Sequence, residues 1–195
     1  MVQDNLFTSN KSPLNQFMSG DEPKKRGGGS REGLEFENEI ERACFMYQTL
    51  KLACIERRQP KAFLGRGKDN KPFVGYAKKT GSDFVGGLLV PEKNTLYLEV
   101  KSTVGGSIDM WQENSGIKRH QLEIMKWLEE CGFICIFLWE IRESKLVYKF
   151  TPLELINGVG GSKKLTIHNC EELKFQKVLR KKQGVNFYWD FLNLL

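Results

Sequence analysis

The uninterrupted apolar run at residues 133–139, Phe-Ile-Cys-Ile-Phe-Leu-Trp, restricts the fold more than any other feature of the sequence. A strand with no polar face has to be covered on both sides by other elements. The run is also far shorter than the ~20 residues that a membrane-spanning helix requires. We therefore expect a buried β-strand at 133–141, within a covered sheet, and no segment that crosses a membrane.

Two stretches carry apolar residues at helical spacing. The first predicts an amphipathic helix over about 34–56. The second predicts a helix that buries Ile117, Gln121, Ile124, Leu128 and Cys131. Gln121 is a polar residue on the apolar stripe, so its amide needs a hydrogen-bonding partner. That partner is either a backbone group, or a metal-bound water or Lys101.

Short β-prone runs lie between and after these helices. Residues 83–90 and 95–102, joined by the polar turn 91–94, predict an antiparallel hairpin. A polar loop follows at 105–115, and residues 145–150 are the expected neighbour of the strand at 133–141. The order helix, strand, strand, helix, strand, strand predicts an α/β sandwich, with a central mixed β-sheet flanked by helices.

Composition divides the chain into three parts. Residues 1–30 are polar, Gly-rich and basic, and predict a flexible basic arm that either solubilises the protein or tethers it to phosphates. Residues 31–158 form the expected globular domain. Residues 159–195 form an extension in which 173–182 read as a basic helix and the apolar tail 187–195 docks on its own domain or on a second subunit.

The charge favours a polyanionic partner. The net charge is +6 and the pI is about 9.0, which suits DNA, RNA or an anionic membrane without choosing among them. The stretch around 60–76 is predicted as irregular structure or a short hairpin. Its four cations are either solvated or phosphate contacts, and we favour the contacts: Lys61, Arg66, Lys68 and Lys71. An odd number of cysteines and no signal peptide predict the cytoplasm as the location.

Strand alternation over 96–101 places Glu99 and Lys101 on one face. Asp83, one hairpin strand earlier, reaches the same end of the sheet. Two carboxylates and a lysine suit phosphodiester hydrolysis, in which the carboxylates hold Mg²⁺ and the lysine orients or deprotonates water or stabilises charge on phosphorus. The alternative is a surface ion pair, which a bare Glu-x-Lys pattern usually is.

Three further side chains are candidates for the same end of the sheet. Glu37 borders the apolar face of the first helix, although it is also one of several acids on a solvated face. Lys118 and Arg119 come shortly before Gln121 in the sequence, so they would lie at the edge of the same site and contact phosphate.

Five short motifs in this order resemble the RecU-like Holliday junction resolvases, within the PD-(D/E)xK nucleases of restriction-endonuclease fold. The motifs lie at residues 33–40, 82–86, 98–101, 120–125 and 131–137. The resemblance implies a restriction-endonuclease-like sandwich. It also implies a catalytic centre of Asp83, Glu99 and Lys101, with Glu37 as a further metal ligand and Gln121 in the same site.

The same resemblance implies a magnesium-dependent homodimer that cuts opposed strands of a four-way DNA junction, with Mn²⁺ as a substitute ion. A two-fold enzyme suits a two-fold substrate. Residues 57–79 are the candidate for the stalk that enters the junction in that family, and the expected location is a bacterial cell or a phage-infected host. The alternatives are a restriction-type or phage DNA-processing nuclease of the same fold, and a DNA-binding module that cuts nothing.

Overall fold

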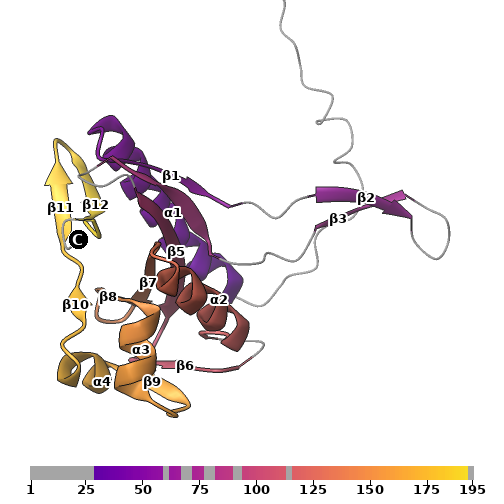
Figure 1. The fold of residues 1–195 in the computed structure, drawn as a ribbon. Helices are drawn as coiled ribbons and strands as arrows, with labels where there is room; N and C mark the ends of the chain where they lie inside the picture. Colours follow the sequence, from indigo (N-terminus) through magenta and orange to yellow (C-terminus); the bar gives the residue numbers. More distant parts are fainter. Residues whose placement is uncertain are drawn as a thin grey trace, which may run out of the picture.

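The computed structural model describes residues 29–58, 62–66, 72–76, 82–89, 94–112 and 116–192. Within these ranges the elements follow one another along the chain as coloured in Figure 1. They are α1 (Gly29–Thr49), β1 (Ala53–Arg57), β2 (Ala62–Arg66), β3 (Pro72–Tyr76), β4 (Phe84–Leu88), β5 (Asn94–Thr103), β6 (Ser107–Asp109), α2 (Arg119–Glu130), β7 (Ile134–Ile141), β8 (Leu146–Phe150), α3 (Pro152–Val159), β9 (Lys164–Thr166), α4 (Ile167–Glu172), β10 (Gln176–Lys177), β11 (Arg180–Gln183) and β12 (Asn186–Trp189). None of the helices in these ranges is long and apolar enough to span a bilayer.

A mixed sheet of six strands, in the order β1-β4-β5-β7-β8-β10, forms the centre of the fold. β5 and β7 run parallel, and the other neighbours in the sheet are antiparallel. Parallel neighbours need a crossover connection, and α2 lies in that connection. The predicted α/β class with a central mixed sheet is confirmed, and the apolar run of the sequence forms the interior strand β7.

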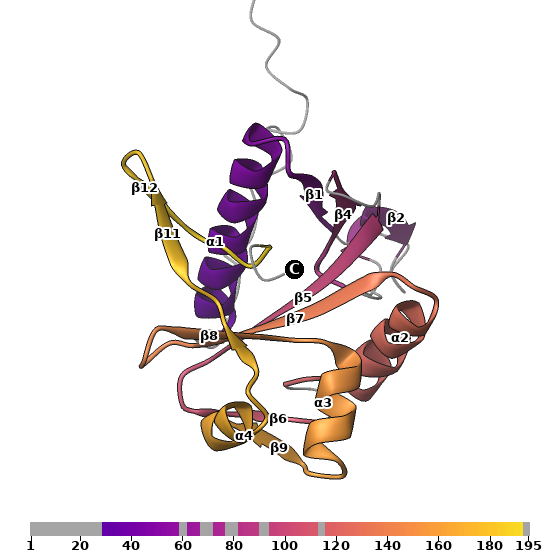
Figure 2. The ribbon, with the colours of Figure 1, turned by 60° about the vertical axis from the view of Figure 1, so that its left-hand side comes forward.

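Helices cover both faces of this sheet, as Figure 2 shows. On one face, α1 packs Phe36, Ile40 and Tyr47 against β5 residues such as Leu98. On the other face, residues of α2, α3 and α4 pack against alternate side chains of β7, including Trp139. Successive residues of β5 therefore enter two different environments, and this separation positions the candidate site.

The first helix ends at Thr49, so the predicted helix over 34–56 is too long. Lys51 has a left-handed φ of 56°, which a continuing helix does not allow. Ala53 and Ile55 are buried in alternation and form the strand β1, which pairs with β4. A β-carbon at Gly86 of β4 would collide with the backbone of Cys54, so this close pairing requires glycine there.

Two other predictions along the chain are wrong. The predicted loop at 105–115 contains β6, which pairs with β9. The predicted basic helix at 173–182 is instead two strands, because α4 ends at Glu172 and Lys174 adopts a left-handed φ of 55°. β10 then joins the edge of the main sheet beside β8, and β11 pairs with β12 in a hairpin that turns at Gly184.

The segment after this hairpin packs against α1 and the sheet. Phe191 is buried in the same core as α1. Tyr47 donates its hydroxyl hydrogen to Asp190 Oδ1 (2.9 Å) and accepts a hydrogen bond from the Leu192 amide (3.1 Å). The Lys149 ammonium group, itself buried, donates to the Phe191 carbonyl oxygen (3.2 Å). A lysine of the sheet thus holds the end of the described chain.

β2 and β3 form a separate antiparallel hairpin, which Figure 1 shows away from the main sheet. This hairpin lies within the stretch 57–79 that was predicted as a stalk, and the stalk function stays a prediction. Among the predicted phosphate contacts, Lys61, Lys68 and Lys71 lie outside the described residues, as does the side chain of Arg66. The predicted basic arm also lies outside them, apart from the first residues of α1.

The burial of the Lys149 ammonium group predicts that the stability of the protein depends on pH. Burial lowers the pKa of its ammonium group from 10.5 to about 8, against the opposing influence of Glu154 and Asp190. Between these values the unfolded chain carries a proton that the folded chain lacks, so the free energy of unfolding rises with pH. Between pH 8 and 10.5, the free energy of unfolding of the wild type should rise by about 3 kcal/mol more than that of Lys149→Met. Urea unfolding at stepped pH measures the difference, and parallel pH profiles for the two proteins would contradict the assignment.

Candidate active site

Strand alternation on β5 separates apolar from charged side chains. Leu98 and Val100 point into the core that contains α1. Glu99 and Lys101 point to the opposite face, where Glu99 meets Gln121 of α2. The sequence predicted this alternation, and the structure confirms that a carboxylate and an ammonium group of one strand lie on the same side.

Glu99 is a completely buried carboxylate. Its Oε1 atom lies 2.8 Å from Lys101 Nζ and accepts a hydrogen bond from Gln121 Nε2 (2.6 Å). Removing a charge from water costs several kcal/mol, and an ion pair offsets that cost only in part. Such an arrangement is weak evidence for stability and is typical of functional sites. The alternative of an exposed surface ion pair does not apply, since the Glu99 side chain is 1% exposed.

Gln121 does find a side-chain partner, although the predicted helical stripe is partly wrong. α2 buries Leu122 and Met125, while Ile124 is 37% exposed. Gln121 lies at the edge of this buried face, and its amide nitrogen donates to Glu99 rather than contacting Lys101. Its buried side-chain carbonyl oxygen has no hydrogen-bond partner among the residues that the structure describes.

Asp83 lies immediately before β4, at the end of the sheet where Glu99 stands. Its Oδ2 atom accepts a hydrogen bond from the Val100 amide (2.9 Å), and its carbonyl oxygen accepts one from the Arg58 amide (2.8 Å). Phe84 pairs with Leu98, so one further step in the register places Asp83 opposite Glu99. Side chains opposite each other in such a pair have Cβ atoms about 4.5–5.5 Å apart.

Glu37 has a different partner. It forms an ion pair with Arg57 of β1, whose guanidinium group also donates to Asn38 Oδ1 (3.0 Å). Within the described ranges, no three His, Cys, Asp or Glu side chains gather closely enough to hold a metal ion. The structure therefore does not bring Glu37 together with Asp83 and Glu99, and its role as a third ligand stays a prediction.

Two arginines at this end of the sheet were not singled out in the sequence, although both follow the predicted helix over 34–56 directly and fall within the predicted stalk at 57–79. Arg57 binds Glu37 and Asn38 of α1, as described above. The guanidinium carbon of Arg58 lies 5.8 Å from the ring centre of Tyr97, on the face of Glu99 and Lys101. Of the predicted cations, Arg119 begins α2 and is exposed, and Lys118 is the residue before it and half-buried. Adjacent basic residues at 57 and 58 were the available clue.

The donor set fits a magnesium ion. Mg²⁺ in phosphate-processing sites is held by one or two carboxylates, and waters and substrate oxygens complete its octahedron. Asp83 and Glu99 supply two carboxylates at one end of the sheet, and the buried carbonyl oxygen of Gln121 is a neutral oxygen beside them. This set would hold a hard divalent ion, with Glu37 available only after its ion pair with Arg57 opens.

No protein-family profile matches the sequence, and no curated protein sequence is detectably similar. Among solved structures, the chain is similar to Hjc of Archaeoglobus fulgidus, a Holliday junction resolvase from an archaeal hyperthermophile. The identity is 12%, the match covers 73% of this chain and 96% of that one, and the TM-score is 0.43. At this level of similarity, function has to be inferred from the site itself.

The contact between Glu99 and Lys101 predicts a thermodynamic coupling. Lys101→Met leaves the buried carboxylate of Glu99 without its cation and should lower the free energy of unfolding by about 3 kcal/mol. Adding Glu99→Gln should restore part of that loss, because the neutral amide does not need the cation. Chemical unfolding of the two single variants and the double variant measures the coupling. Additive losses would show that the two side chains do not interact.

Proposed function

We propose that the protein is a metal-dependent endonuclease that hydrolyses phosphodiester bonds in branched DNA, of the RecU-like Holliday junction resolvase type. The observation that carries this proposal is the buried carboxylate of Glu99, held by Lys101 and Gln121 beside Asp83. A binding module has no use for two carboxylates at a phosphate site, because they repel the ligand. The motif order supports the choice of family and, with it, the restriction-endonuclease-like fold.

Each side chain has a role that follows from its contacts. Asp83 and Glu99 would hold Mg²⁺ or Mn²⁺, which supplies Lewis-acid activation of the phosphate and of the attacking water. Gln121 fixes the orientation of Glu99 through its amide hydrogen bond. In its ion pair, Lys101 is an ammonium group with donors and no acceptor. In that state it donates to a phosphate oxygen or orients water rather than taking a proton.

The cations around the site would contact the DNA backbone. Arg58 follows β1, and Lys118 and Arg119 stand at the start of the helix that carries Gln121. Phosphate contacts from such cations would position a nucleic acid without reading its sequence. Recognition by backbone and shape suits a branched substrate. We further propose a cytoplasmic homodimer that cuts opposed strands, with the hairpin of β2 and β3 as the stalk that enters the junction.

Cleavage of a labelled four-way junction tests the proposal. With Mg²⁺, the wild type should nick opposed strands and leave linear duplex largely uncut. Asp83→Asn should bind the junction with unchanged affinity and cut it at least about a hundredfold more slowly, because one metal ligand is lost. Glu143→Gln, which alters an exposed carboxylate in the turn after β7, is the matched control and should cut at the wild-type rate.

Other outcomes separate the alternatives. Equal cutting of junction and linear duplex would leave a nuclease of another kind, such as a restriction-type or phage DNA-processing enzyme. Binding without cleavage by the wild type, at any divalent ion, would show a non-catalytic DNA-binding module.

A further inference from the structure

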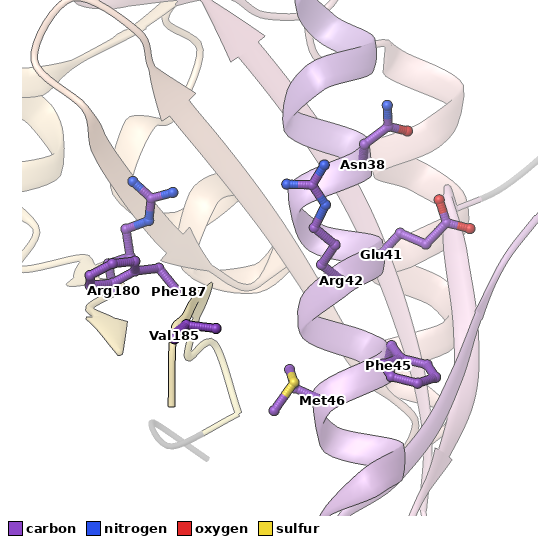
Figure 3. A pocket seen from close by; sticks show the side chains of 8 residues that line it. All are labelled: Asn38, Glu41, Arg42, Phe45, Met46, Arg180, Val185 and Phe187. Atoms are coloured by element: carbon purple, nitrogen blue, oxygen red, sulfur yellow. The ribbon is translucent and has the colours of Figure 1, made fainter. Parts of the chain in front are cut away.

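An open groove of about 710 Å³ lies between α1 and the hairpin of β11 and β12. Figure 3 shows Arg42 and Met46 on the side of α1 toward Arg180, Val185 and Phe187 of the hairpin, whereas Phe45 lies on the other side of the helix. Its volume lies within the range of pockets that hold small ligands. We call it the α1–hairpin groove.

The groove combines exposed apolar side chains with cations. Phe45 is 67% exposed, Val185 88% and Phe187 54%, and all three line the groove. Exposed apolar side chains that gather on one surface often mark an interaction site. Arg42 forms no ion pair with any residue in the described ranges, whereas Glu41, the acid of the lining, lies 3.5 Å from Arg57. The net charge of the lining is therefore positive.

The hairpin of β11 and β12 contributes both aromatic rings and positive charge to the groove. Arg180 lies over the rings of Phe187 and Trp189, and the Lys182 ammonium group lies over the Phe187 ring, 5.7 Å from its centre. Residues 173–183 include several lysines and an arginine but no acid. Arg180 is also 3.5 Å from Glu39, and Lys181 pairs with Asp190, so Arg42 and Lys182 are the cations left for a ligand.

We propose that the α1–hairpin groove binds single-stranded DNA. Non-specific binding of single strands combines a cationic groove along the phosphates with aromatic rings on which bases stack. Arg42 and Lys182 would bind phosphates, and a base would stack on the ring of Phe187. A duplex offers no free base face, whereas a strand opened near a branch does. The choice of DNA over RNA rests on the proposed function.

This groove is separate from the candidate active site. α1 and the hairpin belong to the core on one face of the sheet, where Leu98 and Val100 point. Glu99 and Lys101 point to the other face, toward α2. The groove would therefore hold a strand that the active site does not cut.

Binding of a fluorescent oligothymidylate of about 20 nucleotides, in EDTA so that no cleavage occurs, tests the proposal on the full chain. Phe187→Leu keeps an apolar side chain but removes the ring, and should weaken binding about tenfold; Phe187→Trp should retain it. Arg42→Gln should weaken binding and reduce the slope of log K against log salt by about 0.7, the value for one lost phosphate contact. Lys163→Gln, an exposed cation before β9, is the control and should bind as the wild type does.

Four results would overturn the proposal. They are no binding by the wild type, unchanged binding by both Phe187→Leu and Arg42→Gln, tighter binding of oligouridylate, and a light-scattering mass that halves in Phe187→Leu. The last result would assign the groove to a second copy of the chain. Since binding in EDTA needs no metal and no cutting, a failure of the nuclease proposal would leave these outcomes readable.

Discussion

The burial of the Glu99 carboxylate inside the sheet is the constraint on which the candidate site depends. A buried charge persists only where partners satisfy it, and here Lys101 comes from the same strand and Gln121 from the helix that follows. An apolar residue at this position would stabilise the fold as well or better. The arrangement is therefore best explained by what a fixed carboxylate does for chemistry, beside the second carboxylate of Asp83.

The sheet makes this arrangement possible by separating its two faces. Side chains of β5 alternate, so the residues that build the core with α1 leave the intervening positions for charged groups. The antiparallel register with β4 brings Asp83 to Glu99, and the parallel partner β7 supplies an apolar strand behind them. The same division leaves the outer surface of α1 and the C-terminal hairpin for a separate task, away from the carboxylates.

The sequence predicts the parts of this fold that depend on a period. The alternation in β5, the β-prone run of β4, the apolar run of β7 and the helical spacing of α1 and α2 were sufficient to predict a mixed sheet with Glu99 and Lys101 on one face. The sequence misleads where a backbone turn interrupts a period. The chain leaves the helical conformation near the left-handed residues Lys51 and Lys174, so most of β1 and all of β10 were predicted as helix. Long-range contacts, such as the pairing of β6 with β9 or of Tyr47 with Asp190, leave no local pattern.

The most direct test of the central claim is to locate a bound divalent ion. A crystal structure with Mn²⁺, read from its anomalous scattering, should place an ion about 2.0–2.3 Å from carboxylate oxygens of both Asp83 and Glu99. It would also show whether Glu37 leaves Arg57 to join them. An ion bound elsewhere on the chain, or none at a concentration that supports cleavage, would contradict the assignment of these two carboxylates to a catalytic metal centre.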